Sequence, residues 1–474
     1  MEYMMNRHFQ LIATVLLAIC GETWGQEKFN INGRVISSLT REPVGYATVS
    51  VTGATKYYTI ADSTGNFQIN DVPAGIFSFT ASSVGYVTTV TPQYMILSTT
   101  PFITIEMDDD VAMLSSVTVR STVLERVMDS GIGKQIIGTA DIEKIPGGNR
   151  DISRVIRSYP GIGYSPTGYR NDLIVRGGSP AENAFFIDGI EIPNINHFST
   201  QGASGGPVGI LNADLIEQVE FYTGSLPVDK GSVLSSVMDI KLKDGNLYKN
   251  TYKGTIGAAE AGISGRGHIG SRTTYIYSLR QSYLQMMFKL LKLPFLPNYI
   301  DGQIKVKHRI SDKDEIMVMA LGGIDKMKLN TSLKSEQARY MLSYLPIVGQ
   351  KSFTMGTAYT HYGNKSRTNI SLSYNKLDNK LRKYTDNDES SEDNLIYRIK
   401  SKEEKATIRG ERRQYLGRFN LMTGVQCSYI NYAMDSYERG YMNIQENRYM
   451  TDLDFMNYSV YASANYESYN KKFN

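Results

Sequence analysis

Few side chains of this 474-residue chain are spaced for bond-making chemistry. Four His remain beyond the first 25 residues, and none stands in the H-E-x-x-H or H-x-x-E spacing that holds zinc. A G-x-G-x-x-G at Gly265, Gly267 and Gly270 has strand-like sequence on both sides, whereas a nucleotide-binding loop needs a helix after it. The acidic run Asp108–Asp110 is typical of a solvated hinge rather than a cation site. We therefore expect no enzyme activity, no metal and no cofactor.

The stretch 173–194, LIVRGGSPAENAFFIDGIEIPN, combines short apolar strands with turn-forming residues. This pattern predicts a hairpin in which Leu173–Val175 pairs with Ala184–Ile187 across the turn Gly177–Asn183. The dipeptide Asp188-Gly189 predicts a second, tight turn.

Arg176 and a carboxylate partner in this stretch should lie among apolar strands. Phe185, Phe186 and Ile187 follow one another without alternation, so their strand should be covered on both faces. A buried guanidinium needs a partner, and we expect Arg176 to be at least half-buried and to pair with a carboxylate on Asp188 or Glu191. A purely structural ion pair would satisfy the same pattern.

Length and charge limit the function classes. The chain is long enough for about three domains. Its 51 basic and 47 acidic residues give a net charge of +4, which does not favour a dedicated nucleic-acid binder. Of 33 Tyr, 22 lie at or after Tyr252. Because Tyr suits a boundary between water and lipid, the second half has the composition of a membrane interface.

The N-terminus has the pattern of a secretory leader. Phe9–Ile19 is an apolar core of 11 residues, too short to span a bilayer as a helix, and cleavage is expected before Gln26. The bulky residue before Cys20 argues against a lipid anchor there. Cys427 would be left as the sole Cys, so no intramolecular disulfide is expected. These features fit a Gram-negative envelope protein.

Short strands separated by turns fill residues 26–108. Seven strands at this spacing predict a β-sandwich. They are Ile31–Ile36, Ala47–Val51, Tyr57–Ala61, Asn66–Asn70, Ile76–Ser82, Val87–Val90 and Phe102–Met107.

Helix and strand signals mix in residues 121–246. Asp151 is a good N-cap for a helix that Pro160-Gly161 ends. Asn212 or Asp214 should cap a short helix running through Gln218. The segment Ser235–Leu242 alternates like a strand. An α/β domain is therefore expected between the sandwich and the segments that follow.

Long alternating segments follow Asn250. Ile370, Leu372 and Tyr374 share one face of such a segment while polar residues take the other, as in strands of transmembrane barrels. We count nine candidates, and Leu284–Leu293 reads as a short helical loop. The nine are Tyr252–Ile263, Thr273–Tyr283, Gln303–Ile310, Glu315–Ile324, Ser352–Tyr362, Thr368–Leu377, Ile396–Arg409, Arg418–Tyr432 and Phe455–Tyr466.

These patterns resemble the TonB-dependent outer-membrane receptors of the Bacteroidetes type. Ile174-Val175-Arg176-Gly177 and Ile187-Asp188-Gly189-Ile190 resemble the Arg-Gly strand end and the Asp-Gly turn of their plug domain. The strings LNADLIEQVEFYTGSLPVDKG and SSVMDIKLKDGN follow in the family's order. The first domain resembles a carboxypeptidase-regulatory-like domain, through residues such as Gly33-Arg34-Val35 and Gly85-Tyr86.

The resemblance implies a mainly β architecture and a coupling segment. It divides the chain into a leader (1–25), an Ig-like β-sandwich (26–108), a linker (109–120), an α/β plug (121–246) and the first part of an antiparallel transmembrane β-barrel (250–474). The linker would hold the segment that the TonB protein pulls, with Leu114, Val117 and Val119 as coupling residues joining a partner's sheet edge. The plug gating candidates are Arg176, Gly177, Asp188 and Gly189.

The resemblance also implies location, partners and cargo. The expected location is the outer membrane, with the plug and the N-terminal domain facing the periplasm. Expected partners are the TonB complex, outer-membrane lipid and a small nutrient, namely an iron chelate, cobalamin, an oligosaccharide or a peptide. A surface lipoprotein partner is left open, and no nucleic acid is expected. Alternatives are an adhesion or binding protein and a signalling receptor, both without transport.

The number of strands predicts a partial wall. Barrels of the resembled family have about 22 strands, and nine could not enclose a plug because barrel diameter grows with strand number. We therefore expect the N-terminal part of a longer protein or a prematurely ended reading frame.

Overall fold

The computed structural model describes residues 28–466 apart from 39, 53, 97–101, 109–132, 145–150, 165–170, 200–205, 207, 248, 258, 417–418 and 441–445. The leader and the coupling candidates Leu114, Val117 and Val119 lie outside the described residues.

The N-terminal domain is the predicted β-sandwich. One sheet has the order β4-β1-β9 and another β3-β2-β6-β7, with β5 and β8 as a separate pair. Both sheets contribute to one core, which includes Ile31, Val49, Phe79 and Ile105. The strands are β1 (Lys28–Ser37), β2 (Thr48–Val51), β3 (Ala54–Ile60), β4 (Asn66–Pro73), β5 (Gly75–Phe77), β6 (Phe79–Ser82), β7 (Thr89–Val90), β8 (Tyr94–Ile96) and β9 (Ile103–Met107).

The middle domain, which we call the plug, is a five-stranded sheet with short helices. Its strand order is β10-β15-β16-β13-β14, and β11 and β12 form a separate pair. Its elements are β10 (Lys134–Gly138), α3 (Thr139–Lys144), α4 (Ile152–Ile156), β11 (Ile162–Tyr164), β12 (Leu173–Val175), η1 (Pro180–Glu182), β13 (Asn183–Ile187), β14 (Ile190–Ile192), η2 (Ala213–Leu215), β15 (Ile216–Tyr222) and β16 (Ser236–Leu242).

Predictions in the plug that rest on a helix cap or on a run of apolar residues are confirmed. The Asp151 carboxylate caps α4 by accepting a hydrogen bond from the Ser153 amide at 2.9 Å. Phe185, Phe186 and Ile187 are all buried, as the unalternating run predicts. Asn212 does act as a cap, but its helix ends at Leu215 and the chain continues as β15.

The predicted pairing of Leu173–Val175 with Ala184–Ile187 is wrong. The first segment is β12, which pairs with β11, and the second belongs to β13. Both edges of β13 are already occupied, by β14 in antiparallel and by β16 in parallel orientation. The partner that excludes β12 lies about 50 residues further along the chain, so local turn signals could not reveal it.

The C-terminal half is one antiparallel sheet of ten strands, which we call the wall. Each strand pairs with its neighbour in sequence, and the hairpins include α5 (Leu284–Leu290), α6 (Glu336–Tyr344), η3 (Thr385–Asn387) and η4 (Glu392–Asn394). The strands are β17 (Thr251–Ile256), β18 (Glu260–Ile269), β19 (Thr273–Ser282), β20 (Phe295–Arg309), β21 (Asp314–Leu329), β22 (Ile347–Gly363), β23 (Ser366–Tyr384), β24 (Leu395–Leu416), β25 (Phe419–Arg439) and β26 (Glu446–Tyr466).

The wall differs from the prediction in number and length of strands. Tyr252–Ile263, read as one strand, contains the turn between β17 and β18, which makes ten strands of nine candidates. Most of the other predicted segments, which are about ten residues long, lie within longer strands. The longest strand, β24, has 22 residues. The helical loop at Leu284–Leu293 is confirmed as α5, and α6 was not predicted.

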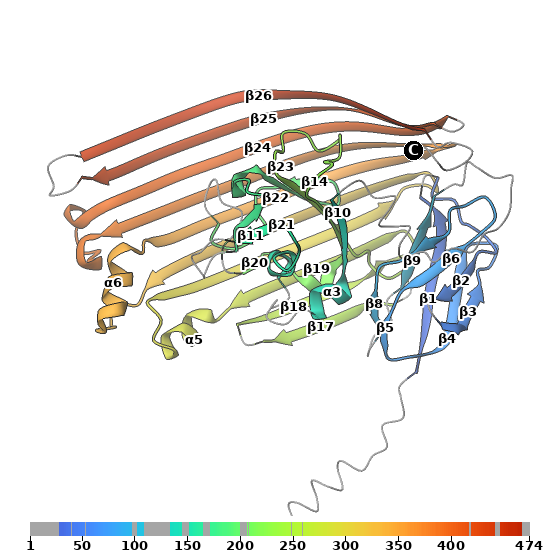
Figure 1. Ribbon diagram of the computed structural model, residues 1–474, viewed down its shortest axis with the longest axis horizontal. Helices are drawn as coiled ribbons and strands as arrows, with labels where there is room; N and C mark the ends of the chain where they lie inside the picture. The colour runs from blue at the N-terminus through green and yellow to red at the C-terminus, as the bar shows by residue number, and fades with distance from the viewer. Residues whose placement is uncertain are drawn as a thin grey trace, which may run out of the picture.

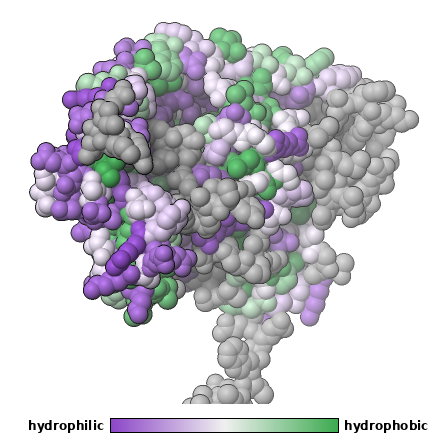
Figure 2. All heavy atoms as spheres, turned by 60° about the vertical axis from the view of Figure 1, so that its left-hand side comes forward, coloured by the Kyte–Doolittle hydropathy of each residue, from purple (hydrophilic) through white to green (hydrophobic). Residues whose placement is uncertain are grey.

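The plug lies against one face of the wall, and the sandwich stands at the end away from α5 and α6 (Figure 1). On the opposite face of the wall, apolar side chains such as Val460 and Tyr458 are 84% and 71% exposed. In a space-filling view, hydrophobic side chains reach the described surface beside hydrophilic ones (Figure 2). Among the described residues, no helix is long and apolar enough to cross a membrane.

Candidate functional site: the seam between plug and wall

The Asp188-Gly189 turn is built as its sequence predicts. Asp188 has φ +48° and Gly189 has φ +82°, and the flanking residues Ile187 and Ile190 pair directly. Two successive residues with positive φ make a tight hairpin turn whose twist suits the strands, and Asp-Gly tolerates that conformation well. The turn places the Asp188 carboxylate at the contact between plug and wall, which we call the seam.

Lys305 of β20 joins this turn to the wall. Its ammonium lies 3.0 Å from Asp188 Oδ2 and 2.9 Å from Asp244 Oδ1, and donates to the Leu242 carbonyl at 3.0 Å. Lys307, two residues along, lies 2.7 Å from Asp244 Oδ2 and 3.4 Å from Glu315. Two wall ammonium groups therefore bind two carboxylates at one end of the plug sheet.

The two carboxylates respond differently to this setting. Burial raises the pKa of Asp188, and Lys305 only partly offsets that effect. Burial also acts to raise the pKa of Asp244, but Lys305 and Lys307 together outweigh it and hold that pKa well below its ordinary value. Of the two carboxylates, Asp244 is therefore firmly ionised. The ionised form of Asp188 is less strongly stabilised at the seam.

A second attachment lies on the next strand of the hairpin. Both carboxylate oxygens of Glu191 lie 2.7 Å from Lys405 Nζ of β24, and the Glu191 carbonyl accepts from Asn375 Nδ2 at 3.0 Å. Close contact here depends on Gly356 of β22, because a Cβ at that position would meet Ile190 at 2.8 Å. The hairpin is thus held by charge on one side and by shape on the other.

The most enclosed attachment centres on His197, in the loop after β14. Its Nδ1 lies 2.7 Å from Asp325 Oδ1 of β21, and its Nε2 lies 3.1 Å from Asp301 Oδ2 of β20. The ring stacks on Tyr299 with centroids 4.0 Å apart, and the Phe198 amide donates to Asp325 Oδ2 at 2.7 Å. His197 and both carboxylates are almost completely buried.

This geometry favours the imidazolium form. Burial acts to lower the pKa of His197, but Asp325 and Asp301 outweigh it and raise the pKa to about 9. Both ring nitrogens then donate to carboxylates, as only the doubly protonated ring can do. Arg280 of β19 adds a second cation, 3.0 Å from Asp301 and 2.9 Å from the Gly209 carbonyl of the plug.

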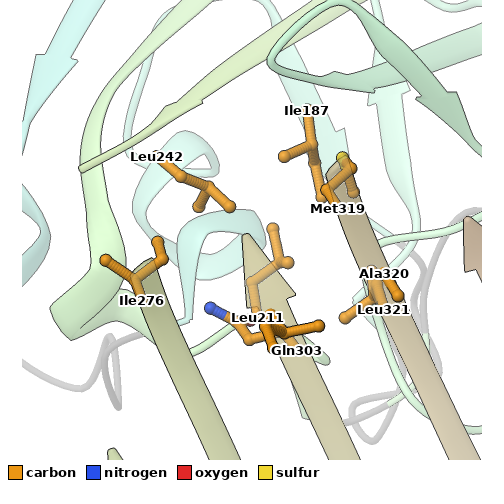
Figure 3. Close-up of a pocket in the computed structure, with 9 residues that line it drawn as sticks. Ile187, Leu211, Leu242, Ile276, Gln303, Met319, Ala320 and Leu321 are labelled. Atoms are coloured by element: carbon orange, nitrogen blue, oxygen red, sulfur yellow. The ribbon is translucent and has the colours of Figure 1, made fainter. Parts of the chain in front are cut away.

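Between these charged attachments the seam is apolar. Ile187, Leu211 and Leu242 of the plug face Ile276, Met319 and Leu321 of the wall around a cavity of about 10 Å³ (Figure 3). That is about the space one water molecule needs. Gln303 borders the cavity and accepts from the Asn212 amide at 3.2 Å, while its Nε2 has no partner among the described residues.

Arg176 does not have the predicted environment. It is exposed, and Asp188 and Glu191 pair with Lys305 and Lys405 instead. Its Nη2 donates to Thr223 Oγ1 at 3.4 Å. Arg176 and Gly177 have φ +50° and +81°, so the Arg-Gly pair is a second tight turn. An exposed turn leaves the guanidinium solvated, which removes the need for a carboxylate partner.

The sandwich contacts both other parts through a further charged cluster. Arg41 lies 3.0 Å from Glu106 of the sandwich and 3.4 Å from Glu315 of the wall. Lys241 of the plug lies 3.7 Å from Glu106 and 3.8 Å from Glu217. Lys241, opposed by burial and assisted by Arg41, lowers the pKa of Glu106 to about 2. Three parts of the chain therefore meet around one ionised carboxylate.

The sequence did not identify His197, Asp301, Asp325 or Lys305 as site residues. One signal was available: Asp301, Lys305 and Asp325 occupy positions of alternating strands whose neighbours on the same face are buried, where a charge needs a partner. The partners lie in the plug, however, and no spacing within a strand names them. Among the described residues, no three His, Cys, Asp or Glu are placed to hold a metal ion.

Two family models match parts of this architecture. The carboxypeptidase regulatory-like domain matches residues 30–108, and the TonB-dependent receptor plug domain matches residues 126–234. The chain carries the plug of a TonB-dependent receptor. The seam just described is therefore the contact of a receptor plug with its wall, in the outer membrane of a Gram-negative bacterium and with the plug facing the periplasm. TonB-dependent receptors are a class of receptors and transporters and not of enzymes.

Solved structures of such receptors share the fold. The ferric enterobactin receptor PfeA of Pseudomonas aeruginosa matches 74% of this chain and 57% of its own, with TM-score 0.52 and 16% identity. FpvA of P. aeruginosa, bound to pyoverdines, matches 71% and 49%, with TM-score 0.53 and 14% identity. The uncharacterized protein YddB of Escherichia coli is 27% identical over 119 residues, 22% of this chain and 15% of YddB. The chain thus spans about half the length of these solved structures.

Proposed function

We propose that the chain works in TonB-coupled import of a small nutrient across the outer membrane. The observation that carries this proposal is the seam, where ion pairs with Lys305, Lys405 and His197 attach the plug to the wall. Water entering such a seam can solvate the separated charges, whereas the plug's own apolar core offers water no such compensation. Apart from the strand on which force acts first, a pulled plug would therefore separate from the wall at these charged attachments before its apolar core opens.

The chain path indicates where force would act first. Gly133 is the first described residue after 109–132 and leads directly into β10. Among the described strands, β10 is an edge strand that pairs only with β15, over five residue pairs. An edge strand can be removed by breaking one ladder, whereas a central strand requires two. Tension from the coupling segment would therefore detach β10 before any other strand of the plug sheet.

The gating candidates take distinct roles in this scheme. Thr223 donates from its amide to the Gly133 carbonyl at 3.0 Å, and Arg176 contacts the Thr223 hydroxyl. The Arg176-Gly177 turn would thus act as a clip at the pulled end of the sheet. Asp188 and Gly189 lie at the opposite end, where Lys305 anchors them. Pulling would release the clip first, and the anchor would keep the rest of the plug against the wall until water enters the seam.

The resemblance to the family suggests four classes of cargo and does not choose among them. Iron chelates, cobalamin, oligosaccharides and peptides are all candidates, and the PfeA and FpvA structures concern ferric enterobactin and pyoverdine. The alternative function is binding or signalling without transport. One observation supports this alternative: Arg41 and Glu106 connect the sandwich to both the plug and the wall. Through these contacts the sandwich could relay ligand binding toward the periplasm.

Deleting residues 110–119 distinguishes transport from binding alone. Cells carrying the deletion should still bind the nutrient, since the wall and plug are intact, and should lose its uptake. The measurement is cell-surface binding and accumulation of labelled representatives of the four cargo classes. A matched variant keeps the length but replaces 110–119 with Gly and Ser, which removes Leu114, Val117 and Val119 without shortening the tether. Uptake at the unaltered rate in both variants would refute TonB coupling through this segment.

A further inference from the structure

Contacts with the plug identify the inner face of the last three wall strands. Arg409 of β24 lies 2.8 Å from Asp229 of the plug, and its Nε donates to the Tyr461 hydroxyl of β26 at 2.9 Å. Thr407 of β24 and Ser428 of β25 share a hydrogen bond of 2.9 Å on the same face. The three strands pair in continuous register, and side chains alternate along each of them. Odd-numbered residues of β24 and β26 and even-numbered residues of β25 therefore point inward.

The two faces of β26 exchange their character partway along the strand. In the part nearer the sandwich, Tyr458 and Val460 face outward, as contact with lipid requires, and polar side chains face inward. In the part away from the sandwich the order is reversed: Leu453 and Phe455 face inward, and the outward positions between and beside them hold aspartates (Figure 1). Carboxylates are unfavourable in hydrocarbon, so this part of β26 stands beyond the apolar band, on the extracellular side. The outward aspartates are Asp452 and Asp454.

The inward side chains of this part form an apolar surface across two strands, which we call the inner patch. Ile430 of β25 pairs with Phe455, and Tyr432 pairs with Leu453. Met434 follows on the same face of β25. Side chains directly opposite each other on one face of a sheet are in contact, so the patch is continuous. Leu453 and Phe455 are 53% and 51% exposed, so about half of each side chain is accessible.

The inner patch begins in the same row as one of the plug's attachments. Lys405 pairs in register with Ile430, and its ammonium lies 2.7 Å from both carboxylate oxygens of Glu191. The plug hairpin of β13 and β14, which carries Glu191, therefore stands beside the patch. A molecule seated on the patch would lie next to the seam.

Glu403 of β24 places a negative charge at the border of the patch. It points inward and pairs in register with Tyr432 on one side and with Leu377 on the other. The cation next to it on the same face of β24, Lys405, is already bound by Glu191. Within the described part of the chain, the half-buried Glu403 carboxylate forms no hydrogen bond and no ion pair. A carboxylate beside an apolar surface is thus left to bind a cation.

We propose that the inner patch and Glu403 bind a short peptide, with an amino group of the peptide on Glu403 and its apolar side chains on Tyr432, Leu453 and Phe455. This inference rests on the import function proposed above and narrows its cargo from four classes to one. A free peptide N-terminus, or a lysine flanked by apolar residues, presents an ammonium next to apolar side chains. That combination matches the arrangement of charge and apolar surface on the wall.

The other three cargo classes match these side chains less well. An oligosaccharide would place hydroxyl groups against Leu453, Ile430 and Met434, which cannot replace the hydrogen bonds lost to water. An iron chelate with anionic oxygen ligands would meet the Glu403 carboxylate, and the ammonium of Lys405 is already engaged in the seam. Cobalamin offers apolar surface but carries a phosphate where the patch requires a cation.

The test measures binding of fluorescent peptides to the purified full chain in lipid nanodiscs by anisotropy, with empty nanodiscs as the blank. The probes are Leu-Phe-Leu-Phe labelled at its C-terminus, the same peptide acetylated at its N-terminus, and Ser-Asn-Ser-Asn with a free N-terminus. The apolar peptide with a free amino group should bind at least about tenfold more tightly than either of the others, because only it engages both the charge and the apolar surface.

Paired variants on the two faces of one strand test the apolar contact. L453N/F455N makes the inner patch polar and should weaken binding of the free-amine apolar peptide at least about tenfold. D452N/D454N alters the adjacent outward positions and should leave binding within about twofold of the unaltered chain. The control changes the same strand at the same height, so a general disturbance of β26 would affect both variants.

A second pair of variants tests the charge. Glu403→Gln should weaken binding of the free-amine apolar peptide about tenfold and leave binding of its acetylated form unchanged. Glu404→Gln removes the neighbouring carboxylate, which faces outward, and should change neither. Equal losses for the free and acetylated peptides in Glu403→Gln would show that the amino group does not bind there, and would overturn the proposal.

Three further results would overturn it. One is binding of Ser-Asn-Ser-Asn as tight as that of the apolar peptide. Another is a lower thermal unfolding midpoint in L453N/F455N than in D452N/D454N, which would assign the patch to a covering segment of polypeptide. The third is a ferric catecholate that L453N/F455N weakens while no peptide binds. Binding in nanodiscs requires no TonB, so this test stands apart from uptake by the variant lacking residues 110–119: bound peptide with unaltered uptake would refute TonB-coupled import and leave the peptide site standing.

Discussion

The seam between plug and wall has two kinds of contact, and they should respond differently to force and to solvent. Around Leu211, Met319 and Leu321 it is an apolar interface with the packing of a domain core. Around His197 and Asp188 it is a set of buried or half-buried ion pairs. Apolar contact loses its free energy in proportion to the area exposed to water. When an ion pair separates, hydration of the two charges recovers part of the lost free energy. Ion pairs therefore separate more readily than apolar contacts once water enters the seam.

This difference suggests how a plug can be both stable and movable. The apolar contacts keep it seated when no force acts, and the charged contacts fix its position relative to named wall residues. Removing one partner of a buried pair should cost far more than weakening a half-exposed pair, because the remaining charge is left without compensation. The following predictions test this ranking, from the largest expected effect to the smallest.

Asp325→Ala should give the largest loss of local stability. The substitution leaves His197 Nδ1 and the Phe198 amide without their acceptor in a site closed to water. We expect the free energy of opening of the loop 194–199 to fall by about 3–5 kcal/mol. Hydrogen exchange of those amides measures it. Asp378→Ala, which removes a carboxylate 3.9 Å from Lys376, should leave this loop unchanged. Equal effects of the two substitutions would contradict a special role for the buried cluster.

Raising the pH should weaken the same attachment without any substitution. The folded-state pKa of His197 is about 9, above the ordinary value of 6.5, so its stabilisation is complete below pH 6.5 and is lost as pH rises through 9. The difference corresponds to about 3 kcal/mol. Exchange protection of the loop 194–199, corrected for intrinsic rates, should fall over this range. His197→Gln should abolish the dependence, and its persistence in that variant would assign the titration to another group.

Local features of the plug were predictable because they depend on a few neighbouring residues. Asp188-Gly189 makes its turn wherever the chain places it, because the two residues tolerate positive φ. Asp151 caps α4 through its own carboxylate. The alternation that marks wall strands is equally local, though the turn between β17 and β18 was hidden within one apolar-rich segment.

The candidate site could not be derived in the same way. His197 meets Asp301 and Asp325 only because a plug loop reaches two neighbouring wall strands more than 100 residues away. Asp188 meets Lys305 for the same reason, and that pairing leaves Arg176 without the carboxylate expected for it. Strand alternation identifies the face on which a charge lies. The identity of its partner depends on how two domains dock, which no local pattern encodes.

The smallest effect should come from the half-exposed pair of Glu191 and Lys405, and salt should reveal its nature. Their side chains are 31% and 19% exposed, so screening limits the pair to about 1 kcal/mol. Lys405→Gln should lower protection of the β14 amides by that amount at low salt and by less near 1 M salt. Leu211→Ala provides the apolar comparison: it should cost about 2–4 kcal/mol at every salt concentration, because cavity formation does not depend on screening. If Lys405→Gln proved insensitive to salt, the hairpin would be held through Ile190 and Gly356, and the charge would contribute little to its attachment.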